Sequence, residues 1–283
     1  MTSIAYLNGE YLPLDEARVS VLDRGFLFAD GIYEVSAVLD GHLVDNQSHL
    51  ARFERSLGEI FLPLPAPMSR VEEIEKELIT RNGVKEGVVY MQVTRGVAPR
   101  DFHFPENVKP TLLMFTQAKT IIDSPTAKSG IKAKTLEDIR WARRDIKSIA
   151  LLAQVLAKQA AHEAGCQEAW MVEDGFVTEG GSSSVFIITK NNVLVTRPNS
   201  HALLPGCTRK AILALAAEKN IRVEERPFTV AEALDAAEAF FTSASAFVTP
   251  VVTIDDQAIG DGTPGPTTKR LREIYIDFAR ASR

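Results

Sequence analysis

Residues 137 to 152 read Glu137-Asp-Ile-Arg-Trp-Ala-Arg-Arg-Asp-Ile-Lys-Ser-Ile-Ala-Leu-Leu152, and the rest of the chain is organised around this stretch. Seven of its first eleven residues are charged, and an apolar run follows directly. A solvated charged face rarely contains Ile139, Trp141 and Ile146, so we expect the segment to be partly buried, with partners for its charges. Lys147 stands where charged residues give way to apolar ones. It is either a paired structural lysine or one used for its amine, and the segment alone favours the structural role.

The composition is that of an ordinary globular protein. The chain has 283 residues, 45% hydrophobic and 24% charged, which is enough for one large or two medium domains. The net charge of -5, with lysines and arginines scattered among acids, argues against a nucleic-acid partner. No apolar run is long enough to span a bilayer, and the N-terminal residues lack the layout of a signal peptide, so we expect no membrane partner.

The cysteines and histidines indicate neither a disulfide framework nor a metal site. Cys166 and Cys207 are too few for a disulfide scaffold and lack zinc-ligand spacing, and the five histidines are dispersed. We therefore expect no metal, and a location in the reducing cytoplasm.

Hairpins alternate irregularly with helices along the chain. Residues 4–12 and 32–44 read as hairpins, with turns at Asn8-Gly9 and Asp40-Gly41. Apolar residues at helical spacing predict helices over 47–60, 71–81 and 148–164. In the last of these, we expect four apolar residues to face a core: Ile149, Leu152, Val155 and Leu156.

The order of these elements predicts the fold class. It lacks the strict strand–helix–strand alternation of a doubly wound fold, so the chain is expected to be α+β with mainly antiparallel sheets. Residues 119–125 are polar and contain Pro125, and they read as a linker. We predict a smaller N-terminal domain over 1–118 and a larger C-terminal domain over 126–283.

Three stretches of the C-terminal half could hold an anion. Leu204-Pro-Gly-Cys-Thr-Arg209 leads into a predicted helix, whose free amides and dipole favour negative charge. Thr242-Ser-Ala-Ser-Ala246 is a turn of small residues, and Glu179-Gly-Gly-Ser-Ser-Ser184 lets backbone approach a ligand closely. Each of them alone is as well explained as a helix cap or a turn. The chain has no Walker A lysine pattern, no GxGxxG and no nucleophile elbow, so nucleotide binding and serine hydrolysis are poorly supported.

Taken together, several segments resemble landmarks of the fold-type IV (class IV) pyridoxal-phosphate-dependent aminotransferases, and most closely those of the bacterial D-amino-acid aminotransferases. The similarity covers nearly the whole chain, and the order and spacing of the landmarks are specific for this two-domain α+β fold and its cofactor. They are Asp23-Arg24-Gly25, Asp30-Gly-Ile-Tyr-Glu-Val35, Val93-Thr-Arg-Gly96, Pro99-Arg100, Glu137-Asp-Ile-Arg140, Asp145-Ile-Lys-Ser148, Thr178-Glu-Gly180 and Gly206-Cys-Thr-Arg209.

The resemblance implies a site for pyridoxal 5'-phosphate, held mainly by the C-terminal domain. Lys147 would form the Schiff base with the cofactor and move a proton between the substrate Cα and the cofactor C4′. Glu179 would pair with the pyridine nitrogen, and Arg52 would bind the phosphate. The other cofactor residues implied are Tyr33 near the lysine amine, Arg140 in a role left open, Leu204 beneath the ring, and Cys207, Thr208, Ser243 and Ala244 around the phosphate.

The substrate pocket departs from the D-amino-acid aminotransferase pattern. Members of that group hold the substrate carboxylate with a tyrosine, an arginine and a histidine two residues after the arginine. Tyr33 and Arg100 match here, but Phe102 stands at the histidine position, and His103 would substitute only if the loop shifts. Ala37 stands at a position where a lysine is common in the group, and Ser184 stands at a position where an asparagine is usual. With Ser183, these residues form the implied substrate site: Tyr33, Ala37, Arg100, Phe102, His103 and Ser183.

The resemblance therefore implies a homodimeric transaminase that moves an amino group from D-amino acids to a 2-oxo acid such as pyruvate or 2-oxoglutarate. The apolar substitutions are similar to the pockets of (R)-selective amine transaminases, so (R)-amine:pyruvate transfer is an alternative main activity. A branched-chain L-amino-acid aminotransferase is a second alternative, against which the Pro99-Arg100 loop argues. An aminodeoxychorismate lyase is less well supported, because the match to the aminotransferase landmarks is nearly continuous. A cofactor-free binding relative is also less well supported, because Lys147, Glu179 and Arg52 are all present.

Overall fold

The structure is a computed structural model, and it describes residues 3 to 281. The chain divides into two compact units, each with its own sheet. The first runs to Thr120 and includes Ile146–Ala150, and the second comprises Ile121–Asp145 and Leu151–Ala281. Lys147 therefore belongs to the first unit, although it lies far beyond the end of that unit's main segment. The predicted domain limits of 1–118, 119–125 and 126–283 stay a prediction.

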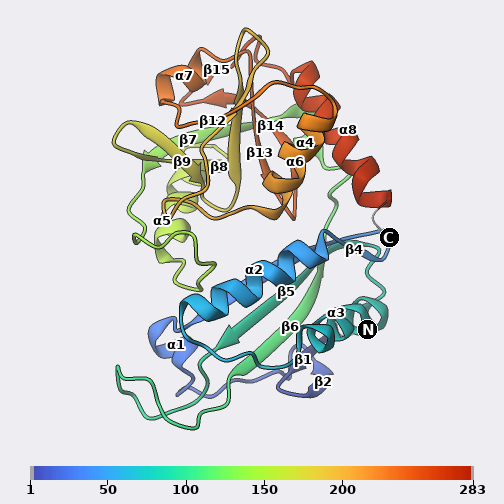
Figure 1. Cartoon of the computed structure of the whole chain (residues 1–283), viewed down its shortest axis with the longest axis vertical. Coiled ribbons are helices and arrows are strands. Elements are labelled where there is room, and N and C mark those ends of the chain that lie inside the picture. Colours follow the sequence, from blue (N-terminus) through green and yellow to red (C-terminus); the bar gives the residue numbers. More distant parts are fainter. Residues whose placement is uncertain (1–2, 282–283) are drawn as a thin grey trace. The chain divides into compact units, whose positions relative to one another are not determined.

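Within the described residues, the first unit is a six-stranded antiparallel sheet in the order β2-β1-β6-β5-β3-β4 (Figure 1). Leu50, Phe53 and Leu57 on one helix form a core with the sheet, and so do Val71, Ile74 and Leu78 on another. The elements are β1 Ile4–Leu7, β2 Glu10–Pro13, α1 Arg24–Phe28, β3 Gly31–Leu39, β4 His42–Val44, α2 Asn46–Glu59, α3 Met68–Asn82, β5 Glu86–Thr94 and β6 Thr111–Ala118.

Local sequence explains where these elements begin and end. Asn8 and Gly9 adopt positive φ in the turn between β1 and β2, and Asp40 and Gly41 do the same between β3 and β4. Both predicted hairpins are thereby confirmed. The helices predicted over 47–60 and 71–81 appear as α2 and α3, and Gly83 ends α3 in the left-handed conformation (φ 60°).

The second unit contains a nine-stranded sheet of described residues, ordered β12-β11-β10-β13-β14-β7-β8-β9, with β15 paired to β14. Three of its strand pairs are parallel, namely β14 with β7, β7 with β8 and β11 with β12. The elements are α4 Pro125–Ser129, β7 Ile131–Glu137, α5 Leu152–Glu163, β8 Glu168–Glu173, β9 Phe176–Gly180, β10 Ser184–Ile188, β11 Leu194–Thr196, α6 Cys207–Glu218, β12 Val223–Glu225, α7 Val230–Leu234, β13 Glu238–Ser243, β14 Phe247–Ile254, β15 Gln257–Ala258 and α8 Pro266–Ala281.

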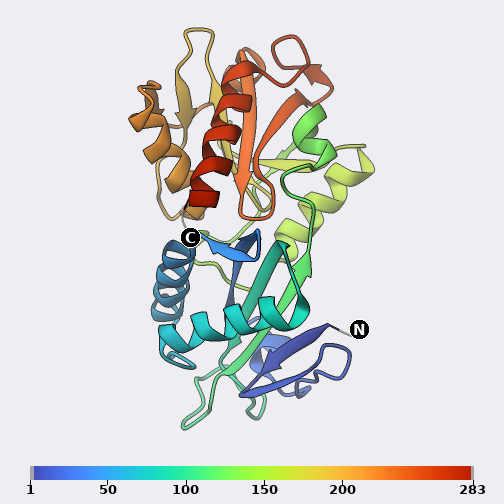
Figure 2. The ribbon, with the colours of Figure 1, turned by 90° about the vertical axis from the view of Figure 1, so that its right-hand side faces the viewer.

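Aromatic packing holds this second unit together. The long helix α8 lies against β13 and β14 (Figure 2), where the Tyr275 ring meets the Phe247 ring edge-on at 4.8 Å between centroids. The rings of Phe186 and Phe240 stack at 4.7 Å on neighbouring strands.

Helices and mixed sheets occur without regular alternation, so the predicted α+β class is confirmed.

The helix after Lys147 differs from the prediction in two ways. It was expected from Ser148, but α5 begins at Leu152, because the backbone of residues 147–149 pairs with the start of β3. Its apolar residues were expected to face a core, but Leu152, Val155 and Leu156 are 71%, 59% and 53% exposed. That expectation is wrong for the single chain, in which only Ala161 of this helix is buried.

A buried carboxyl lies under the sheet of the first unit. Glu75 on α3 is fully buried, and its Oε2 accepts a hydrogen bond from Asn46 Nδ2 at 2.8 Å. Among the described residues, its Oε1 has no hydrogen-bond partner. Burial raises the pKa of Glu75 to about 7, and the hydrogen bond from Asn46 offsets only part of this effect.

We predict that Glu75 makes the stability of the protein depend on pH. Between about pH 4.5 and 7 the folded protein holds a proton that the unfolded chain releases, so stability falls as the pH rises through this window. The loss is on the order of 2 to 3 kcal/mol. Glu75→Gln should remove this loss of stability. Chemical-denaturation midpoints of the wild type and the variant between pH 4.5 and 8 would measure the difference in their pH dependence. Glu77→Gln, at an exposed position of the same helix, is the control. Parallel pH trends in the wild type and Glu75→Gln would contradict the assignment.

Candidate active site

The predicted site residues divide between the two units. Within each unit, the structure brings some of them into direct contact and leaves others apart. The first unit contains Tyr33, Ala37, Arg52, Arg100, Phe102, His103 and Lys147, and the second contains Arg140, Glu179, Ser183, Leu204, Cys207, Thr208, Ser243 and Ala244.

Lys147 is held against Tyr33. The Tyr33 amide donates to the Lys147 carbonyl at 2.9 Å, and Ile32 forms a β-bridge with Ser148. This backbone pairing brings the half-buried Lys147 amine to 4.2 Å from the centroid of the Tyr33 ring. The ring in turn stacks on Tyr90 at 5.8 Å. The two residues that the sequence separates by more than a hundred positions therefore form one contact, and the lysine amine has a defined place.

The charges preceding Lys147 have carboxylate partners, as the sequence predicts. Arg143 Nε donates to Asp145 Oδ1 at 3.0 Å, and Arg144 Nη2 donates to Glu173 Oε1 at 2.6 Å. Each of these arginines therefore has its own counter-charge in the second unit.

Arg52 is fixed by a buried carboxylate. Glu34, on β3, accepts from Arg52 Nε at 2.9 Å and from Arg52 Nη2 at 2.6 Å, and its Oε1 lies 3.0 Å from His49 Nδ1. All three side chains are buried. Burial by itself would raise the pKa of Glu34, but the charge of Arg52 and the bonds from His49 and Arg52 hold it well below its usual range. The two-point bond sets the plane of the guanidinium.

Glu34 and His49 were not among the predicted site residues. A signal for Glu34 exists in the sequence, because its position in the strand alternation places it on the same face as Ile32 and Val38, which are buried in the core. A carboxylate on such a face needs a buried cationic partner.

Glu179 lies buried at the end of β9 in the second unit. Arg140 Nη1 donates to its Oε1, and the Leu204 amide lies 3.2 Å from each carboxylate oxygen. Asp138 holds Arg140 from the other side, with its Oδ1 2.9 Å from Nε. Burial raises the pKa of Glu179, and the charge of Arg140 and the hydrogen bonds partly offset this rise. Three predicted cofactor residues thus form one cluster around a buried acid.

The three predicted anion-binding stretches come together in the second unit. Leu204, from the first stretch, bonds to Glu179, from the loop 179–184. A Cβ built on Gly206 would lie 2.6 Å from Ser184 Oγ, so Gly206 and Ser184 are close neighbours. Ser184 in turn lies opposite Thr242 in the pairing of β10 with β13. The predicted phosphate residues Cys207, Thr208, Ser243 and Ala244 belong to this assembly.

This assembly has groups that a phosphate would satisfy. Among the described residues, no side chain caps the N-terminus of α6, where Cys207 and Thr208 are buried in the first turn. Thr242 Oγ1 is buried with no hydrogen-bond partner in the described part of the chain. Free helix amides and an orphaned hydroxyl are donors for a phosphate, and the nearby buried carboxylate of Glu179 is an acceptor for a protonated pyridine nitrogen. The residues of the second unit therefore fit pyridoxal phosphate.

The side chain of Ser183 supports the loop 179–184. Its hydroxyl donates to the buried Glu168 Oε2 at 3.0 Å, and Lys158 Nζ lies 3.0 Å from Glu168 Oε1. The Ser183 carbonyl accepts from the Gly180 amide at 2.8 Å. The hydroxyl predicted to contact substrate thus has a partner within the fold.

The predicted substrate residues of the first unit lie in different surroundings. Arg100 is exposed, with its guanidinium carbon 5.2 Å from the Phe28 ring centroid and 5.7 Å from that of Phe102. His103 is almost fully exposed, and its Nδ1 lies 3.0 Å from Asp101 Oδ1. Ala37 is buried in the sheet. Whether His103 replaces the missing histidine stays a prediction.

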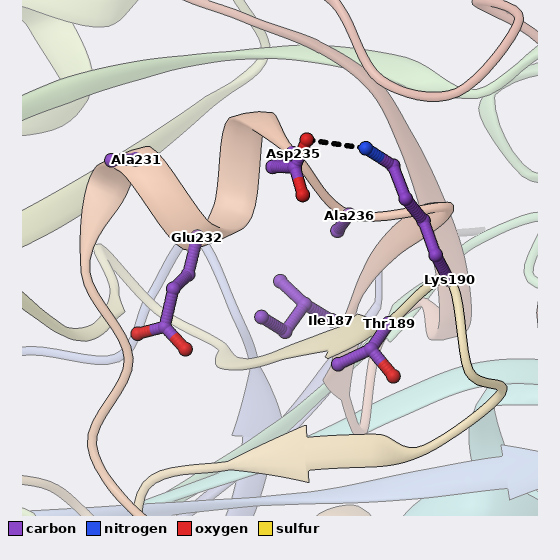
Figure 3. Close-up of a pocket in the computed structure, with 7 residues that line it drawn as sticks. All are labelled: Ile187, Thr189, Lys190, Ala231, Glu232, Asp235 and Ala236. Carbon is purple, nitrogen blue, oxygen red and sulfur yellow. Dashed lines mark hydrogen bonds and ion pairs between the residues drawn. The ribbon is translucent and has the colours of Figure 1, made fainter.

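A separate pocket of about 350 Å³ lies beside α7 in the second unit (Figure 3). Lys190 at its rim pairs with Asp235, and Glu232 accepts from the Thr229 amide. None of the predicted site residues lines it. The residues that line this pocket are Ile187, Thr189, Lys190, Ala231, Glu232, Asp235 and Ala236.

Within residues 3–281, no group of three or more potential metal ligands occurs, and no helix is long and apolar enough to cross a membrane.

The chain is similar to known proteins over most of its length. The family model for amino-transferase class IV matches residues 31–254. The chain is 42% identical to D-alanine aminotransferase of Staphylococcus haemolyticus over 98% of both chains. It is 40% identical to that of Bacillus licheniformis, over 94% of this chain and 93% of the relative.

A solved structure shows the same fold. The branched-chain amino acid aminotransferase from Escherichia coli has a TM-score of 0.88 at 23% identity. The match covers 99% of this chain and 95% of that chain. The predicted fold and family are confirmed, and the chain belongs to the class IV aminotransferase family, whose members use pyridoxal 5'-phosphate.

Proposed function

We propose that the chain is a pyridoxal-phosphate-dependent transaminase that moves an amino group from D-amino acids to a 2-oxo acid such as pyruvate or 2-oxoglutarate. The observation that carries this proposal is the buried Glu179, bonded to Arg140 and Leu204 beside an uncapped helix N-terminus. The two D-alanine aminotransferases, similar over nearly the whole chain, support the D-amino-acid substrate class. When bound, the cofactor supplies an electron sink that makes the substrate Cα proton acidic.

Lys147 is the proposed catalytic residue. Its amine would hold the cofactor through the aldehyde group, and the free amine would take and return the proton at the substrate Cα. Tyr33, whose ring lies 4.2 Å from the amine, limits where the amine can move. A lysine anchored through its own backbone carbonyl keeps its position while its side chain changes role.

The remaining cofactor residues orient the cofactor and neutralise the charge of its phosphate. Glu179 holds a proton at the pyridine nitrogen, and Arg140 and the Leu204 amide keep its carboxylate in place. Arg52, the first turn of α6 with Cys207 and Thr208, and the Ser243-Ala244 turn bind the phosphate. The orphaned hydroxyl of Thr242, the first residue of the predicted anion-binding stretch 242–246, is a further donor.

Arg100 and Tyr33 are the proposed partners of the substrate carboxylate, with Ala37, Phe102, His103 and Ser183 around the substrate side chain. A second candidate activity is transfer from (R)-amines to pyruvate. It is favoured by the apolar surroundings of Arg100, whose guanidinium contacts the Phe28 and Phe102 rings. A donor without a carboxylate needs no charged partner, so such a surface can accept it.

Lys147→Ala tests the catalytic assignment. We expect the purified wild type to be yellow and to keep the cofactor after borohydride treatment, with the added mass on the peptide that contains Lys147. The variant should lose this covalent retention and at least about 1,000-fold of its activity, because both the covalent anchor and the base are removed. Mass spectrometry of peptides measures the first effect. Borohydride retention of the cofactor in the variant would refute the role of Lys147.

Half-reactions with single donors test the substrate class. We expect the absorbance of the bound cofactor to change rapidly with D-alanine and D-glutamate, and more slowly with (R)-1-phenylethylamine. Arg100→Ala should raise the KM for D-alanine about 10-fold to 100-fold, because a charge-assisted bond to the carboxylate is lost, and should hardly change the amine reaction. Rapid turnover of L-leucine alone would instead assign a branched-chain L-amino-acid aminotransferase.

We also propose that the enzyme is a homodimer located in the cytoplasm. Leu152, Val155 and Leu156 form an exposed apolar stripe on α5, and such a stripe at helical spacing is typical of a face that packs against a second chain. The two free cysteines, Cys166 and Cys207, support a reducing compartment.

The stripe predicts how the assembly can be broken. Leu152→Glu/Val155→Glu places two charges where apolar contact is proposed, and should raise the dimer dissociation constant at least about 100-fold. Sedimentation velocity at several protein concentrations measures this change. Thr80→Glu, at an exposed position on α3, controls for added charge. A wild type that sediments as a monomer at all concentrations would contradict the proposal.

A further inference from the structure

Three sequence landmarks that the proposed chemistry does not use meet at one carboxylate in the first unit. They are Asp23-Arg24-Gly25, Asp30 and Thr94-Arg-Gly96. Arg24 Nε and Arg95 Nε each lie 2.8 Å from Asp30 Oδ2, and Arg95 Nη2 lies 3.0 Å from Oδ1. Arg24 and Arg95 are almost fully buried. A single acid thus binds both arginines, and its two-point bond fixes the plane of the Arg95 guanidinium.

The backbone around this cluster allows little movement. The Arg24 amide donates to the Gly96 carbonyl at 2.9 Å, and the Arg95 amide donates to the Asp30 carbonyl at 3.0 Å. A Cβ on Gly25 would lie 2.2 Å from Thr94 Cγ2, so only glycine permits this approach. The two guanidinium groups therefore project from a rigid frame.

Both arginines act on the loop that carries Arg100, residues 97–105. Arg24 Nη1 donates to the Asp101 carbonyl, and Arg24 Nη2 lies 3.4 Å from the Phe102 carbonyl. The guanidinium carbon of Arg95 lies 3.7 Å from the Phe104 ring centroid. The side chains of Phe102 and Phe104 are 76% and 56% exposed, so burial of these two rings contributes little to the position of the loop, in which Ala98 is buried.

We propose that Asp30, acting through Arg24 and Arg95, positions the Arg100 loop and thereby sets the preference for donors that carry a carboxylate. This inference rests on the proposed role of Arg100 in the transaminase. Asp30 is a positioning residue, because it contacts the loop only through the two arginines. Burial would raise the pKa of Asp30, but Arg95 and Arg24 lower it, so the acid keeps its charge throughout the working pH range.

The chemistry of the two donor classes makes the inference specific. A carboxylate binds an arginine well only when the donor groups are correctly placed, and a misplacement of about 1 Å can cost a factor of 100. An (R)-amine with an aryl group in place of the carboxylate makes no such bond. Loosening the loop should therefore affect D-alanine and spare the amine.

The test uses Asp30→Asn and Arg24→Lys in the holoenzyme. Asparagine removes the carboxylate charge that holds both arginines. Lysine replaces the planar guanidinium, with its several N–H donors, by a single ammonium group. Each variant should raise the KM for D-alanine about 10-fold or more. The kcat for D-alanine, and both constants for (R)-1-phenylethylamine, should change less than about two-fold. Glu73→Gln, an exposed acid paired with Arg70 in the same unit, is the matched control.

Two further readouts separate positioning from a general structural role. In a double-mutant cycle, Asp30→Asn should add nothing to the KM of Arg100→Ala, because the anchor that it positions is already gone. Amide hydrogen exchange should become faster across residues 97–105 in both variants, and stay unchanged in α2 and β5. Cofactor absorbance should be unchanged.

Distinct outcomes identify which proposal fails. Equal increases in KM for both donors, a further increase in the Arg100→Ala background, or unchanged exchange of the loop would overturn the positioning role of Asp30. If Arg100→Ala leaves the KM for D-alanine unchanged while loop exchange rises in Asp30→Asn, the proposed carboxylate anchor fails, and the specificity inference fails with it. If Asp30→Asn does not fold, Arg24→Lys supplies the same comparison.

Discussion

The backbone pairing between residues 147–149 and the start of β3 is the constraint on which the proposed chemistry depends. The Tyr33 amide donates to the Lys147 carbonyl at 2.9 Å, and the Ile149 amide donates to the Gly31 carbonyl at 3.1 Å. These main-chain bonds place the lysine beside Tyr33 without using its side chain. They also delay the start of α5, because residues that bond to a strand cannot simultaneously begin a helix.

Carboxylates in both units are paired with arginines. Glu34 pairs with Arg52, Asp30 pairs with Arg24 and Arg95, and Glu179 pairs with Arg140. In each case a bond to the carboxylate fixes the plane of a guanidinium or the orientation of an acid. A group held this way can meet a phosphate, a pyridine nitrogen or a substrate carboxylate with little loss of side-chain entropy. Positioning by paired charge is thus shared by the proposed cofactor residues and the Arg100 loop.

Local sequence was sufficient where the determinant was local. The hairpins at Asn8-Gly9 and Asp40-Gly41 follow from residues that tolerate positive φ, and the end of α3 follows from Gly83. The stripe on α5 shows the limit of such reasoning. Its spacing predicts an apolar face correctly, but the side of the helix that the fold of one chain covers is decided by tertiary packing, and Leu152, Val155 and Leu156 remain exposed.

The sequence by itself determined the family, the cofactor class and the identity of the candidate site residues, because these are carried by residue types at fixed spacing. Only the tertiary structure decided which residues support them. Glu34 pairs with Arg52 and contacts His49, Glu168 accepts from Ser183, and Asp30 joins Arg24 to Arg95. Apart from Arg24 and Asp30, these partners are at least 15 positions apart, and local propensity does not relate them. Their pairing follows from strand register and from the cost of burying a charge alone, which appears only when the chain is folded.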